Sequence, residues 1–175
     1  MAPTAVKRGQ VSLEFLTTYG WAIVLLVAIA AVLFWLGVIN PRTVVTSTCA
    51  LPADLGCKGY AMNLSGTLLF DMGQSTGKSI RVDALRCTQE TNPNFTGADN
   101  LTAPVTIANG GHARLTNWTK SCYRLNSTGN PEIAAGSVGG LYKGRVYIQY
   151  VELDNGLPHL VAGDVVLRYE DIPSP

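Results

Sequence analysis

An uncharged, apolar run near the start of the chain restricts what this sequence can fold into more than any other feature. From Phe15 to Ile39 the sequence has 25 consecutive residues without a charge. As a helix, the run would be about 37 Å long at about 1.5 Å per residue, more than the roughly 30 Å core of a bilayer. Asn40-Pro41 ends the run, because proline lacks an amide proton and disfavours helix in the preceding residue. We therefore predict a membrane-crossing helix.

Three charged residues lie on the N-terminal side of this run. Lys7 and Arg8 come before it, and Glu14 lies directly at its start. By the positive-inside rule, the N-terminus is cytoplasmic and the remainder of the chain lies outside. The run is too long for a secretory signal, and no Ala-x-Ala cleavage site follows it. A carboxylate at the edge of an apolar helix is costly unless a partner pairs with it, so we expect Glu14 to have a function.

The residues around Glu14 carry a resemblance to a known family. Lys7-Arg8-Gly9 is followed by Gln10-Val11-Ser12-Leu13-Glu14-Phe15 and then by the apolar run. This arrangement resembles the class III signal peptide of archaeal type IV pilin-like proteins. The resemblance implies that a prepilin peptidase cuts between Gly9 and Gln10, which makes Glu14 the fifth residue of the mature chain.

Cleavage would give Glu14 a partner. It removes Lys7 and Arg8, which leaves 13 − 2 = 11 basic and 12 acidic side chains, and it creates an α-ammonium group on Gln10. Glu14 would accept hydrogen bonds from that ammonium in a neighbouring subunit. Lipid and a helix bundle are both apolar, so packing and polar pairing decide assembly. Cyclisation of Gln10 to pyroglutamate would remove the ammonium and this pairing.

The remainder, residues 41–175, has short β-rich runs separated by turn residues. The predicted strands are residues 42–47, 61–70, 79–86, 104–108, 112–117, 141–153 and 160–170. In the sixth, Val146, Ile148 and Tyr150 alternate with more polar residues, and Asp154-Asn155-Gly156 marks the following turn. About seven such strands favour an antiparallel sandwich. The predicted fold class is α+β: a leader (1–9), a long N-terminal hydrophobic α-helix (10–40), and an extracellular, Ig-like antiparallel β-sandwich (41–175).

Four cysteines lie in the predicted outer domain: Cys49, Cys57, Cys87 and Cys122. An even number outside the cell favours two disulfides, for which three pairings are possible. We favour Cys49–Cys57, which closes a short local loop, and Cys87–Cys122, which joins two distant strands. Zinc binding is the alternative, but no pair has the two-residue spacing of a zinc knuckle.

The same region contains five N-glycosylation sequons, which begin at Asn63, Asn94, Asn100, Asn117 and Asn126. Each motif alone is weak, because asparagine and threonine are also common loop residues. On an exported chain we expect at least two to carry N-linked glycans. Asn63 is the least favourable because it lies in a predicted strand. The sugars would protect the domain from proteases and mask its strand edges.

The sequence gives no support for an enzyme, a metal or a cofactor. Residues 72–79 look like a phosphate-binding loop, but Gly73 and Gly77 enclose three residues where four are required, so we predict a turn. His112 and His159 are the only histidines and belong to no catalytic motif. A net charge of +1 does not favour nucleic acid as a partner.

These features together predict a structural subunit of an archaeal type IV-like pilus. The helix would form the filament core and the β-domain its outer sheath, first at the cell membrane and then on the cell surface. The resemblance implies as partners further copies of the chain, the prepilin peptidase, an assembly ATPase with its membrane platform protein, and the membrane before assembly. It also implies a use in adhesion. The alternatives are a minor pilin or pseudopilin, an archaellum subunit, or a monomeric membrane-anchored binding domain.

Overall fold

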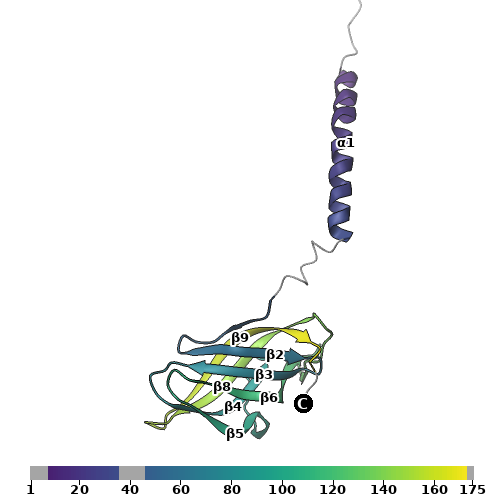
Figure 1. Ribbon diagram of the computed structural model, residues 1–175. Helices are drawn as coiled ribbons and strands as arrows, with labels where there is room; N and C mark the ends of the chain where they lie inside the picture. Colours follow the sequence, from purple (N-terminus) through teal and green to yellow (C-terminus); the bar gives the residue numbers. More distant parts are fainter. Residues whose placement is uncertain (1–7, 36–45, 173–175) are drawn as a thin grey trace, which may run out of the picture. The chain divides into compact units, whose positions relative to one another are not determined.

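The computed structural model describes the backbone of residues 8–35 and 46–172, and the side chains of residues 19–35 and 46–172. The chain divides into two compact units, residues 1–44 and 45–175. The first contains helix α1, and the second contains all the described strands (Figure 1).

Helix α1 comprises Arg8–Trp35. Alanine and leucine are frequent in it and proline is absent, which favours a helix. In the described part of the chain, we find no helix that is both long enough and apolar enough to cross a membrane. The prediction of a long, membrane-crossing hydrophobic helix over residues 10–40 is therefore wrong. The described apolar side chains of the helix end at Trp35, whereas the predicted apolar run extended to Ile39.

Nine strands make up most of the second unit. They are β1 (Thr48–Ala50), β2 (Leu55–Asn63), β3 (Thr67–Gln74), β4 (Ile80–Thr88), β5 (Asn100–Ile107), β6 (His112–Leu125), β7 (Pro131–Ile133), β8 (Leu141–Glu152) and β9 (Pro158–Glu170). A short 3-10 helix, η2 (Gly97–Asp99), precedes β5.

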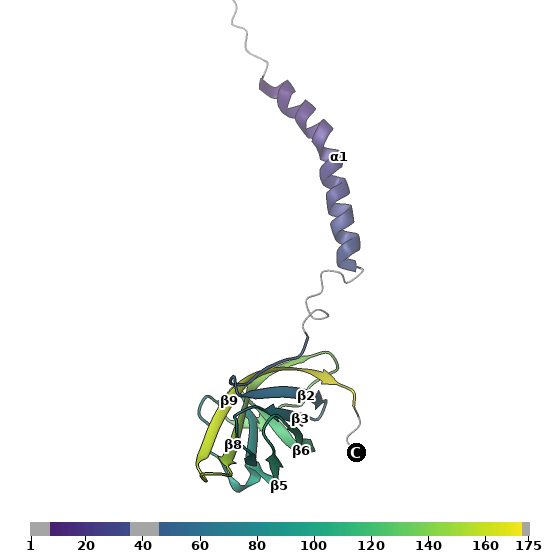
Figure 2. The same ribbon diagram turned by 60° about the vertical axis from the view of Figure 1, so that its left-hand side comes forward.

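All nine strands belong to one sheet, in the order β5-β4-β8-β9-β2-β3-β6-β7, with β1 paired to β9. An additional pairing of β6 with β4 closes six of these strands into a ring, and the strands wrap around a common interior (Figure 2). Two of the pairings are parallel, β2 with β9 and β4 with β6. The predicted antiparallel Ig-like sandwich is therefore wrong. Alternation along a strand fixes which of its faces is buried, but not whether two sheets stack or one sheet closes.

The positions of several strands also differ from prediction. Residues 61–70 are not one strand, because β2 and β3 are joined by a tight turn at Gly66, which has φ +80° and donates its N–H to the Asn63 carbonyl. Residues 42–45 of the first predicted strand lie outside the described residues, and Thr46 and Ser47 precede β1. The connection between the predicted strands 79–86 and 104–108 is shorter than expected, since β4 ends at Thr88 and β5 begins at Asn100, and β7 was not predicted.

The core lies inside the ring. Its fully buried side chains include Met62, Leu68, Phe70, Ile80, Leu85, Val146, Ile148 and Leu167. Val146, Ile148 and Tyr150 are buried, as their alternation predicted. Tyr147, on the opposite face of β8, is also buried, because its hydroxyl donates to the carbonyls of Glu90 and Thr91 in the loop that leads to β5.

Candidate assembly and modification sites

The described surface of α1 is apolar on every side. Leu25, Ala28, Ile29, Val32 and Leu33 line a shallow groove of about 270 Å³. Their spacing places them on one face of the helix, with the small Ala28 on the same face as the larger side chains. The exposed residues Val24, Phe34 and Trp35 extend the apolar surface along the helix. Such a surface suits another helix, because a small residue lets two backbones approach closely.

The predicted processing and assembly residues lie in the first turns of α1. Gly9, Gln10 and Glu14 are helical, but their side chains are outside the described ones, so their roles stay predictions. The Gly9–Gln10 bond lies in the first turn of α1. Cleavage there would remove the carbonyls of Arg8 and Gly9, which in a helix accept hydrogen bonds from the N–H groups four residues later. Gln10 and Glu14 are four residues apart and therefore share one face.

Both disulfides of the structure have the pairing favoured from the sequence. Cys49–Cys57 joins β1 to β2 with Cα atoms 6.1 Å apart, and Cys87–Cys122 joins β4 to β6 with Cα atoms 4.5 Å apart. The second disulfide lies in the parallel pairing that closes the ring.

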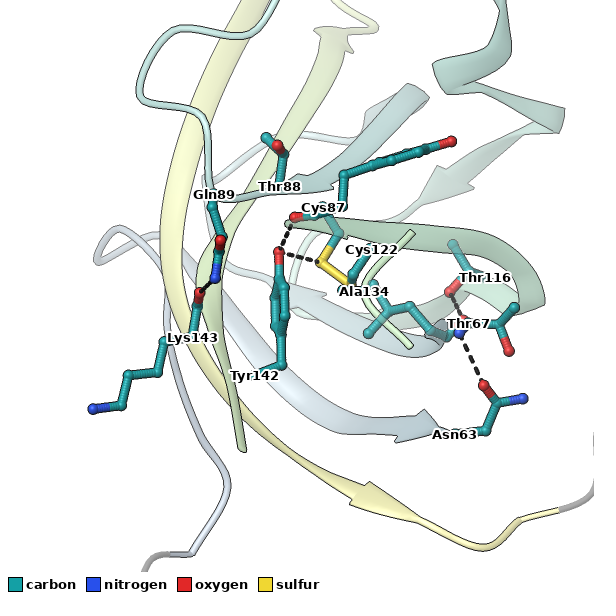
Figure 3. The surroundings of a disulfide bond; sticks show 12 residues. Asn63, Thr67, Cys87, Thr88, Gln89, Thr116, Cys122, Ala134, Tyr142 and Lys143 are labelled. Atoms are coloured by element: carbon teal, nitrogen blue, oxygen red, sulfur yellow. Dashed lines mark hydrogen bonds between the residues drawn. A yellow bond between two sulfur atoms is a disulfide. The ribbon is translucent and has the colours of Figure 1, made fainter. Parts of the chain in front are cut away.

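The hydroxyl of Tyr142 points toward the Cys87–Cys122 disulfide (Figure 3). Its hydroxyl donates to the Tyr123 carbonyl at 2.9 Å and lies 3.7 Å from the sulfur of Cys87. Burial raises the pKa of Tyr142 well above its ordinary value of 10, with a smaller contribution from Tyr169. The disulfide is therefore buried next to a neutral tyrosine hydroxyl.

An ion-pair cluster anchors the loop between β4 and β5. Arg86, whose side chain is 12% exposed, pairs with Glu90 at 2.7 Å and with Asp99 at 3.2 Å, and Asp99 is only 7% exposed. The guanidinium also lies over the ring of Tyr123, 5.6 Å from its centroid. The Asn94 carbonyl accepts a further hydrogen bond from Arg86. The cluster thus holds the loop that carries one of the predicted glycosylation sites.

The five sequon asparagines differ in solvent accessibility. Asn63 is 4% exposed, and its side-chain oxygen accepts the Thr67 N–H at 2.9 Å in the β2–β3 turn (Figure 3). Asn94, Asn100 and Asn117 are exposed. Asn126 is partly buried, and its side-chain oxygen accepts hydrogen bonds from Thr128 and Asn130. Four of the five are therefore accessible at least in part, and Asn63 is not.

Asn117 has an unusual backbone neighbour. Trp118 has φ +62°, a left-handed conformation that is rare for a bulky side chain. The bulge there interrupts the register between the pairs Leu69–Asn117 and Leu68–Lys120. Lys120 then reaches the start of β5 and donates to the Asn100 carbonyl at 2.6 Å. Lys120 thus joins the segments that carry Asn100 and Asn117.

The remaining motifs form no common site among the described residues. Residues 72–74 end β3, so only residues 75–79 of the predicted turn connect β3 to β4, and the Gln74 side chain donates to the carbonyls of Lys78 and Ile107. His112 lies 3.1 Å from Asp71, and His159 stacks on Tyr150. The described residues contain no group of metal-ligating side chains. No protein-family model, curated protein or solved structure matches the chain.

Proposed function

We propose that the chain is a structural subunit that assembles with copies of itself through α1, as an archaeal type IV-like pilin. The exposed apolar surface of α1 carries this proposal. A helix that is apolar all round needs apolar surroundings, and a bundle of identical helices supplies them. Small residues such as Ala28 favour close packing in that bundle.

Two further features support the proposal. The Gly9-Gln10 and Glu14 arrangement has the spacing of a pilin processing and assembly segment. Two disulfides in one domain suit an oxidising extracellular setting, where the β-domain would form the outer sheath of an adhesive filament. The proposed partners are the prepilin peptidase, an assembly ATPase with its platform protein, and N-linked glycans.

The first test concerns processing and the assembly charge. Filaments sheared from cells should contain a chain that begins at Gln10 or at its pyroglutamate form. Glu14→Ala and Glu14→Gln should both abolish filaments in electron micrographs, because neither variant retains the charge that pairs with the Gln10 ammonium. Normal filaments from Glu14→Gln would refute the role of the charge, and a functional chain that retains residues 1–9 would refute the pilin assignment.

The second test concerns the surface of α1. Val32→Glu places a charge in the apolar groove and should abolish filaments, while near-ultraviolet circular dichroism of the β-domain stays unchanged. Leu157→Glu is the matched control, because Leu157 lies in the β-domain and is 54% exposed against 55% for Val32. Normal filaments from Val32→Glu would overturn the proposal that α1 forms the assembly surface.

A further inference from the structure

The chain enters the β-domain through a very short strand. β1 has three residues, and it pairs antiparallel with β9, so that Thr48 lies opposite Val166 and Ala50 opposite Asp164. Just before it, Ser47 accepts the N–H of Arg168 at 3.0 Å. A force that reaches the domain from the α1 side of the chain acts first on this segment.

Pairing with β9 alone would resist such a force poorly. In an antiparallel pair, the N-terminal end of β1 lies beside the C-terminal side of β9. A pull on the N-terminus of β1 against the C-terminus of β9 therefore opens the pair at one end. The hydrogen bonds between the strands then break one after another, and a three-residue strand offers few of them.

The Cys49–Cys57 disulfide transfers the force from β1 to β2. It connects Cys49 in β1 directly to Cys57, near the N-terminal end of β2. β2 is parallel to β9, with Met62 opposite Tyr169 and Asn63 opposite Glu170. The pulled ends of these two strands therefore point in opposite directions, and the force acts along the strands.

β2 is also held firmly on its other side. It pairs with β3 from Leu55, opposite Gln74, to Met62, opposite Leu68. A force along β2 strains all of these pairs at once, whereas peeling strains one pair at a time. The side chain of Met62 is fully buried in the core, so movement of β2 would also expose apolar surface.

We propose that the Cys49–Cys57 disulfide is a mechanical clamp that transfers tension from the chain entering the domain to β2, so that the sheet is sheared instead of peeled. The inference rests on the proposed function, because only a subunit of a filament that holds a surface carries such tension. It assigns different roles to the two disulfides: Cys49–Cys57 acts on force transfer, and Cys87–Cys122 on closure of the ring.

The Cys49–Cys57 disulfide also prevents a defined length of chain from extending under force. Eight residue steps separate Cys49 from Cys57. Fully extended at about 3.4 Å per residue, they would span roughly 27 Å. The disulfide replaces that span by a Cα–Cα distance of 6.1 Å. Loss of the bond should therefore release at most about 21 Å of additional extension, and less while Leu55 and Gly56 stay paired with β3.

The test is single-molecule force spectroscopy on the full chain, held by handles attached at its two ends. The wild-type domain should break in one high-force event with no earlier extension of the segment before β2. Cys49→Ser/Cys57→Ser should show an early low-force step of at most about 21 Å, followed by unfolding. The matched control, Cys87→Ser/Cys122→Ser, should lack that early step. If the Cys49→Ser/Cys57→Ser variant shows no early step, the clamp is refuted.

Ser47→Ala provides a test that leaves both disulfides intact. It removes the acceptor that Ser47 offers to Arg168, and so weakens the segment that precedes the clamp. The main rupture force should not change, because tension passes on through Cys49 to β2. A marked fall in that force would show that the contacts of β1 with β9 carry the tension, and would overturn the proposal even if the cysteine variant does not fold. Single chains are pulled here, so this outcome is independent of the filament tests of Val32→Glu.

Discussion

Replacement of Arg86 by leucine tests the ion-pair cluster most directly. The substitution leaves Asp99 buried without its cationic partner, and breaking a buried pair in this way costs about 3–5 kcal/mol. We expect the lower end of that range for two reasons. Thr96 still donates its N–H to Asp99 at 2.7 Å, and leucine removes the buried Nε of Arg86, which has no hydrogen-bond partner among the described residues.

A loss of about 3 kcal/mol predicts a clear thermal shift. The described β-domain spans residues 46–172, or 172 − 46 + 1 = 127 residues. At about 2.1 cal/mol/K per residue, its unfolding entropy is roughly 0.27 kcal/mol/K, so the melting temperature should fall by about 11 °C. Thermal unfolding of the full chain, followed by circular dichroism, measures this shift.

Arg81→Leu is the control from the same strand. Arg81 pairs with Asp83 at 2.8 Å, but its side chain is exposed, and such pairs contribute at most about 1 kcal/mol. We expect a shift of less than about 4 °C. Addition of Asp99→Asn to Arg86→Leu should recover part of the loss, because it removes the unpaired buried charge. Equal small shifts for both arginine variants would refute the role assigned to the cluster.

Three further predictions concern titration and modification. Hydrogen bonding by Lys78 lowers the pKa of Glu152 below its ordinary 4.5, so Glu152 stabilises the fold above pH 4.5 and this contribution is lost as the pH falls through the lowered pKa. In Glu152→Gln, the free energy of unfolding should therefore depend less on pH in this acidic range. An unchanged pH dependence would contradict the pairing. Burial raises the pKa of Tyr142 above 10, so the contribution of its neutral form to stability is lost as the pH rises beyond 10. In Tyr142→Phe, the free energy of unfolding measured with urea should therefore fall less at alkaline pH. Peptide mass spectrometry of the native protein should find glycans at Asn100 and Asn117 but none at Asn63, and a glycan at Asn63 would contradict its burial in the folded domain.

Features of the fold that depend on neighbouring residues could be predicted from the sequence. The alternation of Val146, Ile148 and Tyr150 marked the buried face of β8, since side chains of a strand alternate between its two faces. The same local information missed the β2–β3 turn, although Asn63 and Gly66 are typical turn residues in positions that suit one. Gly66 is the signal in the sequence that divides the predicted strand 61–70 into two strands and places Asn63 in the turn between them.

Closure of the sheet could not be predicted in this way. It depends on β2 meeting β9 and on β4 meeting β6, pairings between segments that are distant in the sequence. Neither pairing changes the alternation along its strands, so a stacked sandwich and a closed sheet predict similar patterns. The Arg86 cluster was missed for a related reason, because Glu90 and Asp99 meet Arg86 only after the intervening loop has folded back.

The position of β9 sets the order in which the domain can be completed. It is the last of the described strands in sequence, yet it lies between β8 and β2 inside the sheet. Met62 and Asn63, in one of the first strands, find their parallel partners only when Tyr169 and Glu170 are available. A chain synthesised from its N-terminus therefore keeps the edge of β2 open until Tyr169 and Glu170 have appeared. Since contacts between such distant residues also slow folding, this interval is when an unfinished domain is most exposed to wrong pairing with its neighbours.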